Sequence, residues 1–230
     1  MLVTTRRRLA RRSVAIGSMA ALTAGAAYLA VPSFAATGGG ACQLAGTANF
    51  DAPGLTATGG NFTYSFSGAL SGCNSNVSGA PAKGTIAAGS AYTQTVSGTD
   101  PTTGPWSVTY ALPQAKGSGG CAQSTTAGTS VTTWPDGTKT VATYSTSGAA
   151  AAVALQGTVV ASATLNEVSS TGTVPAGTPT TSTVTSTNTT FPAGDGVAGS
   201  LVFQVADPTA CQTGVRTAGI SGAVGLGSPN

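Results

Sequence analysis

The stretch NFTYSFSGAL, residues 61–70, carries the clearest strand pattern in the sequence. Phe62, Tyr64 and Phe66 alternate with polar residues, so their aromatic rings fall on one face of an extended chain. The pattern predicts a half-buried strand whose aromatic face packs in the core, because phenylalanine is usually buried. The alternative is an aromatic platform for sugar rings. The lack of charged residues beside the row favours the core.

A second stretch, TTWPDGTKTVATYS at residues 132–145, predicts the turn of a β-hairpin. Pro135 fixes φ, Asp136 can hydrogen-bond within its own turn, and Gly137 tolerates positive φ. Aspartate and lysine near Trp134 also raise the alternative of a ligand site. The turn chemistry accounts for Asp136 without a ligand, and Trp134 is then a core or rim aromatic residue.

Other short segments along the chain also have the sequence pattern of strands. Valine and threonine are abundant, and β-branched side chains suit a pleated, half-buried surface. The predicted strands are 43–50, 61–70, 84–97 (one or two, broken near Gly89), 106–112, 125–134, 139–147, 151–167 (one, or two joined at Gly157), 199–205 and 215–226. About nine or ten short strands predict an all-β fold, an antiparallel β-sandwich or barrel-like domain.

Residues 168–190 are rich in threonine and serine and carry no charge. Such a composition is typical of a linker between domains. The cysteine pairing expected below crosses this segment, so we interpret it as an excursion within one domain. An exposed edge strand is expected at residues 181–189.

Four cysteines, Cys42, Cys73, Cys121 and Cys211, predict two disulfides, because their number is even and the chain has an export signal. Three pairings are possible in principle. We favour Cys42–Cys73 and Cys121–Cys211, because the first pair brackets a compact stretch of strand signals. A zinc site would require closely spaced cysteines or histidines, and the sequence has neither.

The N-terminus has the pattern of a secretory signal peptide over residues 1–35. Five arginines precede an uncharged, alanine-rich stretch that ends at Ser33-Phe34-Ala35. We expect cleavage after Ala35, so that residues 36–230 form a single secreted domain. An uncleaved membrane helix is the alternative, and either the Sec or the twin-arginine export route fits the arginines.

The predicted signal peptide and the rest of the chain differ in net charge. The sequence has nine basic and six acidic residues, and five of the basic residues lie in the signal. Four basic and six acidic residues then remain, which gives a net charge of −2. Four scattered cations form no basic patch, so we expect no binding to nucleic acid. We also expect no stable membrane insertion after cleavage.

The sequence shows no catalytic constellation. It contains no histidine, which excludes Ser–His–Asp and Cys–His arrangements. Paired carboxylates for glycoside hydrolysis would have to come from five aspartates and one glutamate, several of which precede glycine or proline in turn patterns. We therefore predict no catalytic residues, no metal site and no cofactor.

Four stretches resemble known proteins when taken together. They are STTAGT (124–129), WPDGTKTV (134–141), YSTSGAAAAVALQGTVV (144–160) and GVRTAGISGAVGLG (214–227). They look like stretches of small secreted four-cysteine, β-rich proteins of actinobacteria, whose function is unassigned. The resemblance covers most of the mature chain and implies an exported β-rich domain, with no active site to transfer.

The sequence favours a non-catalytic structural or interaction protein of the extracellular space or cell envelope. Its expected partner is an envelope polymer or a surface protein. The alternative is a carbohydrate or envelope-polymer binding module that uses Trp106 or Trp134, and an enzyme is the third hypothesis. Exposed tryptophans on an open face would favour the binding module, whereas buried ones would favour the first hypothesis.

Overall fold

The structure, a computed structural model, describes residues 39–227. This part of the chain contains thirteen strands and two short 3-10 helices, and it has no α-helix. The predicted signal peptide and its cleavage site after Ala35 lie outside the described residues. None of the helices in residues 39–227 is long and apolar enough to cross a membrane.

The strands are β1 (Gly40–Phe50), β2 (Gly60–Ser75), β3 (Gly84–Ala88), β4 (Thr93–Asp100), β5 (Gly104–Ala111), β6 (Ala115–Gly119), β7 (Gln123–Thr133), β8 (Lys139–Ala149), β9 (Ala152–Val160), β10 (Ser162–Thr171), β11 (Thr181–Thr185), β12 (Gly196–Gln204) and β13 (Thr217–Gly227). The 3-10 helices are η1 (Gly89–Ala91) and η2 (Pro208–Gln212).

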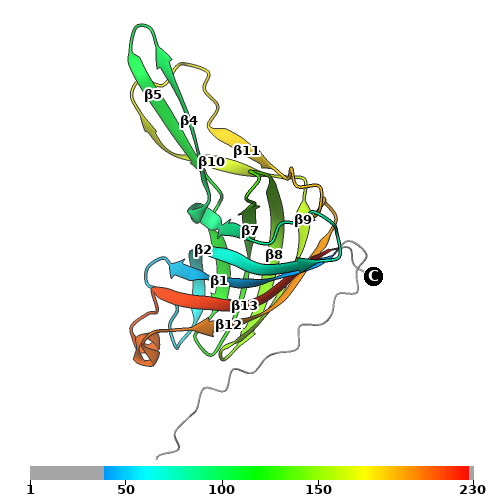
Figure 1. Cartoon of the computed structure of the whole chain (residues 1–230). Coiled ribbons are helices and arrows are strands. Elements are labelled where there is room, and N and C mark those ends of the chain that lie inside the picture. Colours follow the sequence, from blue (N-terminus) through cyan, green and yellow to red (C-terminus); the bar gives the residue numbers. More distant parts are fainter. Residues whose placement is uncertain (1–38, 228–230) are drawn as a thin grey trace, which may run out of the picture.

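Nine strands form one antiparallel sheet that closes into a barrel (Figure 1). Pairing runs β1-β13-β12-β9-β8-β7, and β1 also pairs with β2. Two short strands share the position between β2 and β7: β3 pairs with both along one half, and β6 pairs with both along the other. The barrel wall therefore has eight positions, and its closure removes the free edges of an open sheet.

The aromatic row of β2 faces the barrel core, as the sequence predicts. Phe62, Tyr64 and Phe66 are buried in the main hydrophobic cluster. Glycines opposite the rings provide the necessary space. A side chain at Gly117 of β6 would collide with the ring of Phe62, and a Cβ at Gly46 of β1 would lie 2.5 Å from the ring of Phe66.

A second, four-stranded sheet, in the order β11-β10-β5-β4, lies against the barrel. Its β4–β5 hairpin projects away from the barrel (Figure 1). Val108 and Tyr110 of β5 and Leu165 of β10 form a second core with Val131 of β7 and Val141 of β8. We call this four-stranded sheet the cover sheet, because it buries Val131 and Val141 on the outer side of β7 and β8.

The Thr/Ser-rich segment 168–190 is part of the cover sheet. Its first residues end β10, and β11 then pairs antiparallel with β10 at the edge of the sheet. The loop between these strands is anchored by Tyr110, whose hydroxyl donates a hydrogen bond to the carbonyl of Pro179 (2.7 Å). The expected edge strand is thus present, although it is shorter than the predicted 181–189.

Both disulfides have the predicted pairing, Cys42–Cys73 and Cys121–Cys211. Cys42–Cys73 links the neighbouring strands β1 and β2. Cys121–Cys211 links the β6–β7 turn to η2.

Each end of the barrel has its own set of contacts. At one end, which we call the tryptophan end, Trp134 packs on Phe191 with ring centroids 5.5 Å apart. The opposite end holds loop 51–59, in which Leu55 pairs with Val215 in an isolated bridge and is 3% exposed. We call this segment the Leu55 loop.

The structure has more strands than the nine or ten predicted. The segment 151–167 divides at Ala161 into β9 and β10, which belong to different sheets, and not at Gly157. The break near Gly89 is confirmed, since η1 separates β3 from β4. Strand β6 was not predicted, because the segment 115–119 contains two glycines and one small hydroxyl residue and has no apolar alternation.

Candidate functional site

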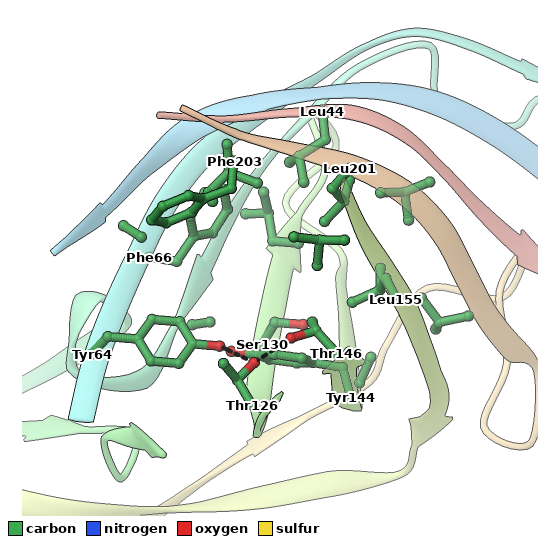
Figure 2. Close-up of a pocket in the computed structure, with 18 of the residues that line it drawn as sticks. Leu44, Tyr64, Phe66, Thr126, Ser130, Tyr144, Thr146, Leu155, Leu201 and Phe203 are labelled. Atoms are coloured by element: carbon green, nitrogen blue, oxygen red, sulfur yellow. Dashed lines mark hydrogen bonds between the residues drawn. The ribbon is translucent and has the colours of Figure 1, made fainter. Parts of the chain in front are cut away.

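The barrel interior contains a partly open cavity of about 130 Å³. Apolar side chains form most of its wall, as Figure 2 shows for Leu44, Phe66, Leu155, Leu201 and Phe203. They come from strands β1, β2, β9 and β12, whose alternate residues point inward.

Strands β7 and β8 give the opposite wall a polar character. Their inward residues are mostly hydroxyl side chains: Ser124, Thr126, Ser130, Thr132, Thr140, Tyr144 and Thr146. Their outward residues include Val131 and Val141, which are almost fully buried under the cover sheet. The rest of the outer face is polar and largely exposed, for example at Thr125, Thr143 and Ser145. This strand pair thus has hydroxyl side chains on both faces, with an apolar patch outside the barrel at Val131 and Val141.

Four of the inward hydroxyls form a chain of hydrogen bonds, which we call the hydroxyl chain (Figure 2). Tyr64 of β2 lies at its centre, with its hydroxyl 2.8 Å from that of Tyr144 and 2.9 Å from that of Thr126. Thr126 in turn lies 2.7 Å from the hydroxyl of Thr146, its cross-strand neighbour. The order is therefore Tyr144–Tyr64–Thr126–Thr146.

Glycine makes room for this arrangement. Gly128 faces Tyr144 across the β7–β8 pair, and a Cβ at position 128 would lie 2.9 Å from the Tyr144 hydroxyl and 2.8 Å from the Cβ of Ala115. A larger residue at this position would displace the phenol ring, so the position of the Tyr144 hydroxyl depends on a glycine of the neighbouring strand.

Both tyrosines of the hydroxyl chain stay protonated at neutral pH. Desolvation by burial raises the pKa of Tyr64 above its usual value, against the opposing effect of its hydrogen bonds to Thr126 and Tyr144. Desolvation likewise raises the pKa of Tyr144 well above its usual value, and the neighbouring Tyr64 raises it further. The chain is thus a set of neutral donors and acceptors.

Among the described residues that line the cavity there is no aspartate, glutamate, lysine or arginine. General acid–base catalysis near neutral pH usually needs a group whose pKa lies close to the working pH. Burial raises the pKa values of Tyr64 and Tyr144, which moves them further from neutral pH. The cavity is therefore suited to binding a neutral molecule and offers no side chain suited to proton transfer at neutral pH.

The aspartates in turns hold those turns together. Asp136 accepts hydrogen bonds from the backbone N–H and the hydroxyl of Thr138, as the turn interpretation predicts, and these bonds lower its pKa. Asp100 and Asp207 act in the same way at their own turns, and hydrogen bonds lower the pKa of each. Within residues 39–227, no three acidic or cysteine side chains cluster in a way that could hold a metal ion.

Trp106 and Trp134, the ligand-contact residues suggested by the sequence, lie in different parts of the fold. Trp134 is 2% exposed, and its indole N–H donates to the Thr140 hydroxyl (2.8 Å) at the tryptophan end. Trp106, on β5 of the cover sheet, is half-buried and packs over Gly98 of β4. Neither tryptophan lines the cavity.

A second hollow lies on the outside of the barrel, over β2, β6 and β7. It is a wide, open groove of about 560 Å³, bordered by Asn61, Thr63, Lys116, Ser118 and Thr125. It contains one cation, and Phe62 is its one aromatic residue. Because that ring is buried in the main core, the groove offers no exposed face on which a sugar could stack.

The hydroxyl wall was not predicted from the sequence. Tyr64 was expected in the aromatic core row, and the segments that form β7 and β8 were expected to form an ordinary hairpin. Hydroxyl residues occur on both faces of these segments, at 124, 126, 130 and 132 and also at 125, 129 and 133, so no alternation marked the inward face. In a half-buried hairpin such residues are expected to face water, so their inward direction could not be derived from this segment alone.

Comparison of the chain with protein-family models, curated proteins and solved structures gives no match in any of the three.

Proposed function

We propose that the protein is a secreted, non-catalytic binding protein that holds a small, mainly apolar molecule inside its barrel. The observation that carries this proposal is the combination of an apolar cavity with a wall of inward hydroxyls on β7 and β8. Buried hydroxyl groups reduce stability unless they are hydrogen-bonded. A bound molecule with a polar atom would use hydrogen-bonding capacity that the fold leaves on this wall.

Secretion is supported by the arginine-rich N-terminal pattern and by two disulfides, which form and persist in oxidising compartments. The non-catalytic character is supported by the uncharged lining of the cavity. The polymer-binding alternative has less support, because Trp134 is buried and Trp106 lies against Gly98. Sugar-binding modules need aromatic rings on an open face.

Thermal unfolding with toluene as the probe tests this function. A ligand at a hundred times its dissociation constant stabilises the folded state by about 2.7 kcal/mol. For a domain of this size, that corresponds to an increase in Tm of roughly 5–11 °C.

The matched variants are Ala142→Leu and Ala154→Leu. Ala142 lines the cavity from β8, whereas Ala154 lies on the exposed outer face of β9. We expect the first substitution to abolish the toluene effect and the second to leave it unchanged. An equal toluene effect in both variants would place binding outside the barrel and refute the proposal.

A further inference from the structure

We infer that the ligand is a small neutral ring compound that carries one hydroxyl group, of the size and polarity of phenol or cyclohexanol, and that this hydroxyl joins the hydroxyl chain. The inference rests on the proposed function and specifies its ligand. Three properties of the cavity lead to it: its volume, its lack of charge and the number of protons in the hydroxyl chain.

Volume limits the size of the ligand. The cavity measures about 130 Å³. An apolar protein cavity of about 150 Å³ holds one benzene molecule. A single six-membered ring with one substituent therefore fits inside the barrel, whereas most of a long acyl chain or a sugar polymer would extend outside the cavity.

Charge limits the chemical class. No ionised side chain lines the cavity, and burial of an unpaired charge is strongly unfavourable. Carboxylates and amines that are ionised at neutral pH would have no counter-ion here. The tyrosines Tyr64 and Tyr144, whose pKa values are raised by burial, remain neutral hydrogen-bonding groups.

The hydroxyl chain determines the polar group of the ligand. Four hydroxyls are joined by three contacts. Each hydroxyl has one proton and two lone pairs, so three protons fill the contacts and a fourth has no acceptor within the chain. Three of the eight lone pairs are used in the same contacts, which leaves five.

One free donor beside several free acceptors is best matched by a group that accepts once and also donates. A carbonyl or ether oxygen accepts the free proton but leaves the acceptors unused. A hydroxyl does both and extends the chain by one member. The apolar ring then lies against the opposite wall, which includes Leu44, Leu155 and Leu201 (Figure 2).

The experiment compares phenol with toluene, which have the same shape but differ in the hydroxyl group. Binding of each is measured by titration calorimetry at pH 7 to the wild type and to the double variant Tyr64→Phe/Tyr144→Phe. Tyr110→Phe is the control, because it removes a buried tyrosine hydroxyl from the second core, outside the cavity. Thr146→Val, which removes the terminal hydroxyl with little change in shape, is a second test in case the double variant does not fold.

We expect the ratio of phenol affinity to toluene affinity to fall about tenfold in the double variant, as for the loss of one hydrogen bond. We expect it to fall by a smaller factor in Thr146→Val and to stay unchanged in Tyr110→Phe. Benzoate, which is charged at pH 7, should not bind.

If toluene binds but the ratio stays within twofold in both hydroxyl variants, the ligand class inferred here is wrong and the proposed function stands. Binding of benzoate as tight as that of phenol would also refute the ligand class. If neither toluene nor phenol binds the wild type, both the ligand class and the proposed function fall.

Discussion

The disulfide Cys121–Cys211 holds the Leu55 loop over one end of the barrel, and its removal should affect both stability and ligand exchange. Backbone hydrogen bonds run from Ala57 N–H to the Cys211 carbonyl (2.7 Å) and from Cys121 N–H to the Thr56 carbonyl (3.1 Å). These bonds tie the Leu55 loop to both cysteines. Replacing both cysteines with serine therefore loosens the loop together with the cross-link.

The magnitude follows from the lengths of chain that the two disulfides close. Cys121 and Cys211 are 90 residues apart, whereas Cys42 and Cys73 are 31 residues apart. The restriction of the unfolded chain then stabilises the fold by about 4.6 kcal/mol for the first bridge and about 3.7 kcal/mol for the second. Urea denaturation of the two double-serine variants, followed by tyrosine and tryptophan fluorescence, measures both values.

Ligand exchange separates loop anchoring from general destabilisation. Bound toluene should leave the Cys121→Ser/Cys211→Ser variant faster than the wild type, because the Leu55 loop lines one end of the cavity. The Cys42→Ser/Cys73→Ser variant should retain the wild-type exchange rate, since that bridge joins two strands that are already paired. NMR exchange spectroscopy reports both rates. Equally faster toluene exchange in the two variants would refute the role of the loop. A larger loss of stability in Cys42→Ser/Cys73→Ser than in Cys121→Ser/Cys211→Ser would refute the chain-entropy argument.

Three further predictions follow from the described contacts and from the N-terminal pattern. Thr140→Val removes the acceptor of the buried Trp134 N–H and should lower the free energy of unfolding by about 1–3 kcal/mol. A loss below about 0.5 kcal/mol in urea denaturation, which is typical of a surface substitution, would contradict this prediction. The free energy of unfolding should be nearly constant from about pH 5 to 8, because the sequence has no histidine. The free energy of unfolding should decrease above the usual tyrosine pKa of 10.0. The folded-state pKa values of Tyr64 and Tyr144 are raised, so these groups lose their protons at lower pH in the unfolded state than in the folded state. If the double tyrosine-to-phenylalanine variant loses as much stability at alkaline pH as the wild type, another group is responsible. Intact mass spectrometry of the exported protein should find Ala36 at its N-terminus, and a full-length chain in the membrane fraction would exclude cleavage.

Local patterns were enough to predict several elements of this fold. The alternation at Phe62, Tyr64 and Phe66 predicted both strand β2 and its buried face. Asp136 and Gly137 predicted the β7–β8 turn, which has the expected hydrogen bonds and a positive φ of 82° at Gly137. These predictions succeeded because each depends on residues that are neighbours in the sequence.

The closure of the barrel and the position of the site depend on contacts that are distant in sequence. Strands β3 and β6 share one position in the barrel wall, and the glycine-rich β6 is defined by its partners more than by its own residues. The hydroxyl chain joins Tyr64 to Tyr144, 80 residues apart. Sequence periodicity identifies which residues share a face, but it does not identify what lies against that face.

The cover sheet stabilises the strand pair that carries the hydroxyl wall. Val131 and Val141 point away from the barrel and would face water in an isolated barrel. The cover sheet leaves them 1% and 0% exposed, and full burial of one such side chain stabilises a fold by about 1.5–3 kcal/mol. The four members of the hydroxyl chain avoid the cost of about 1–3 kcal/mol for a buried polar group without a partner, because each has at least one hydrogen-bond partner. Apolar burial on the outer side and hydrogen bonds among the inward hydroxyls therefore both stabilise the β7–β8 pair, and the lone pairs that the hydroxyl chain does not use lie beside an apolar cavity.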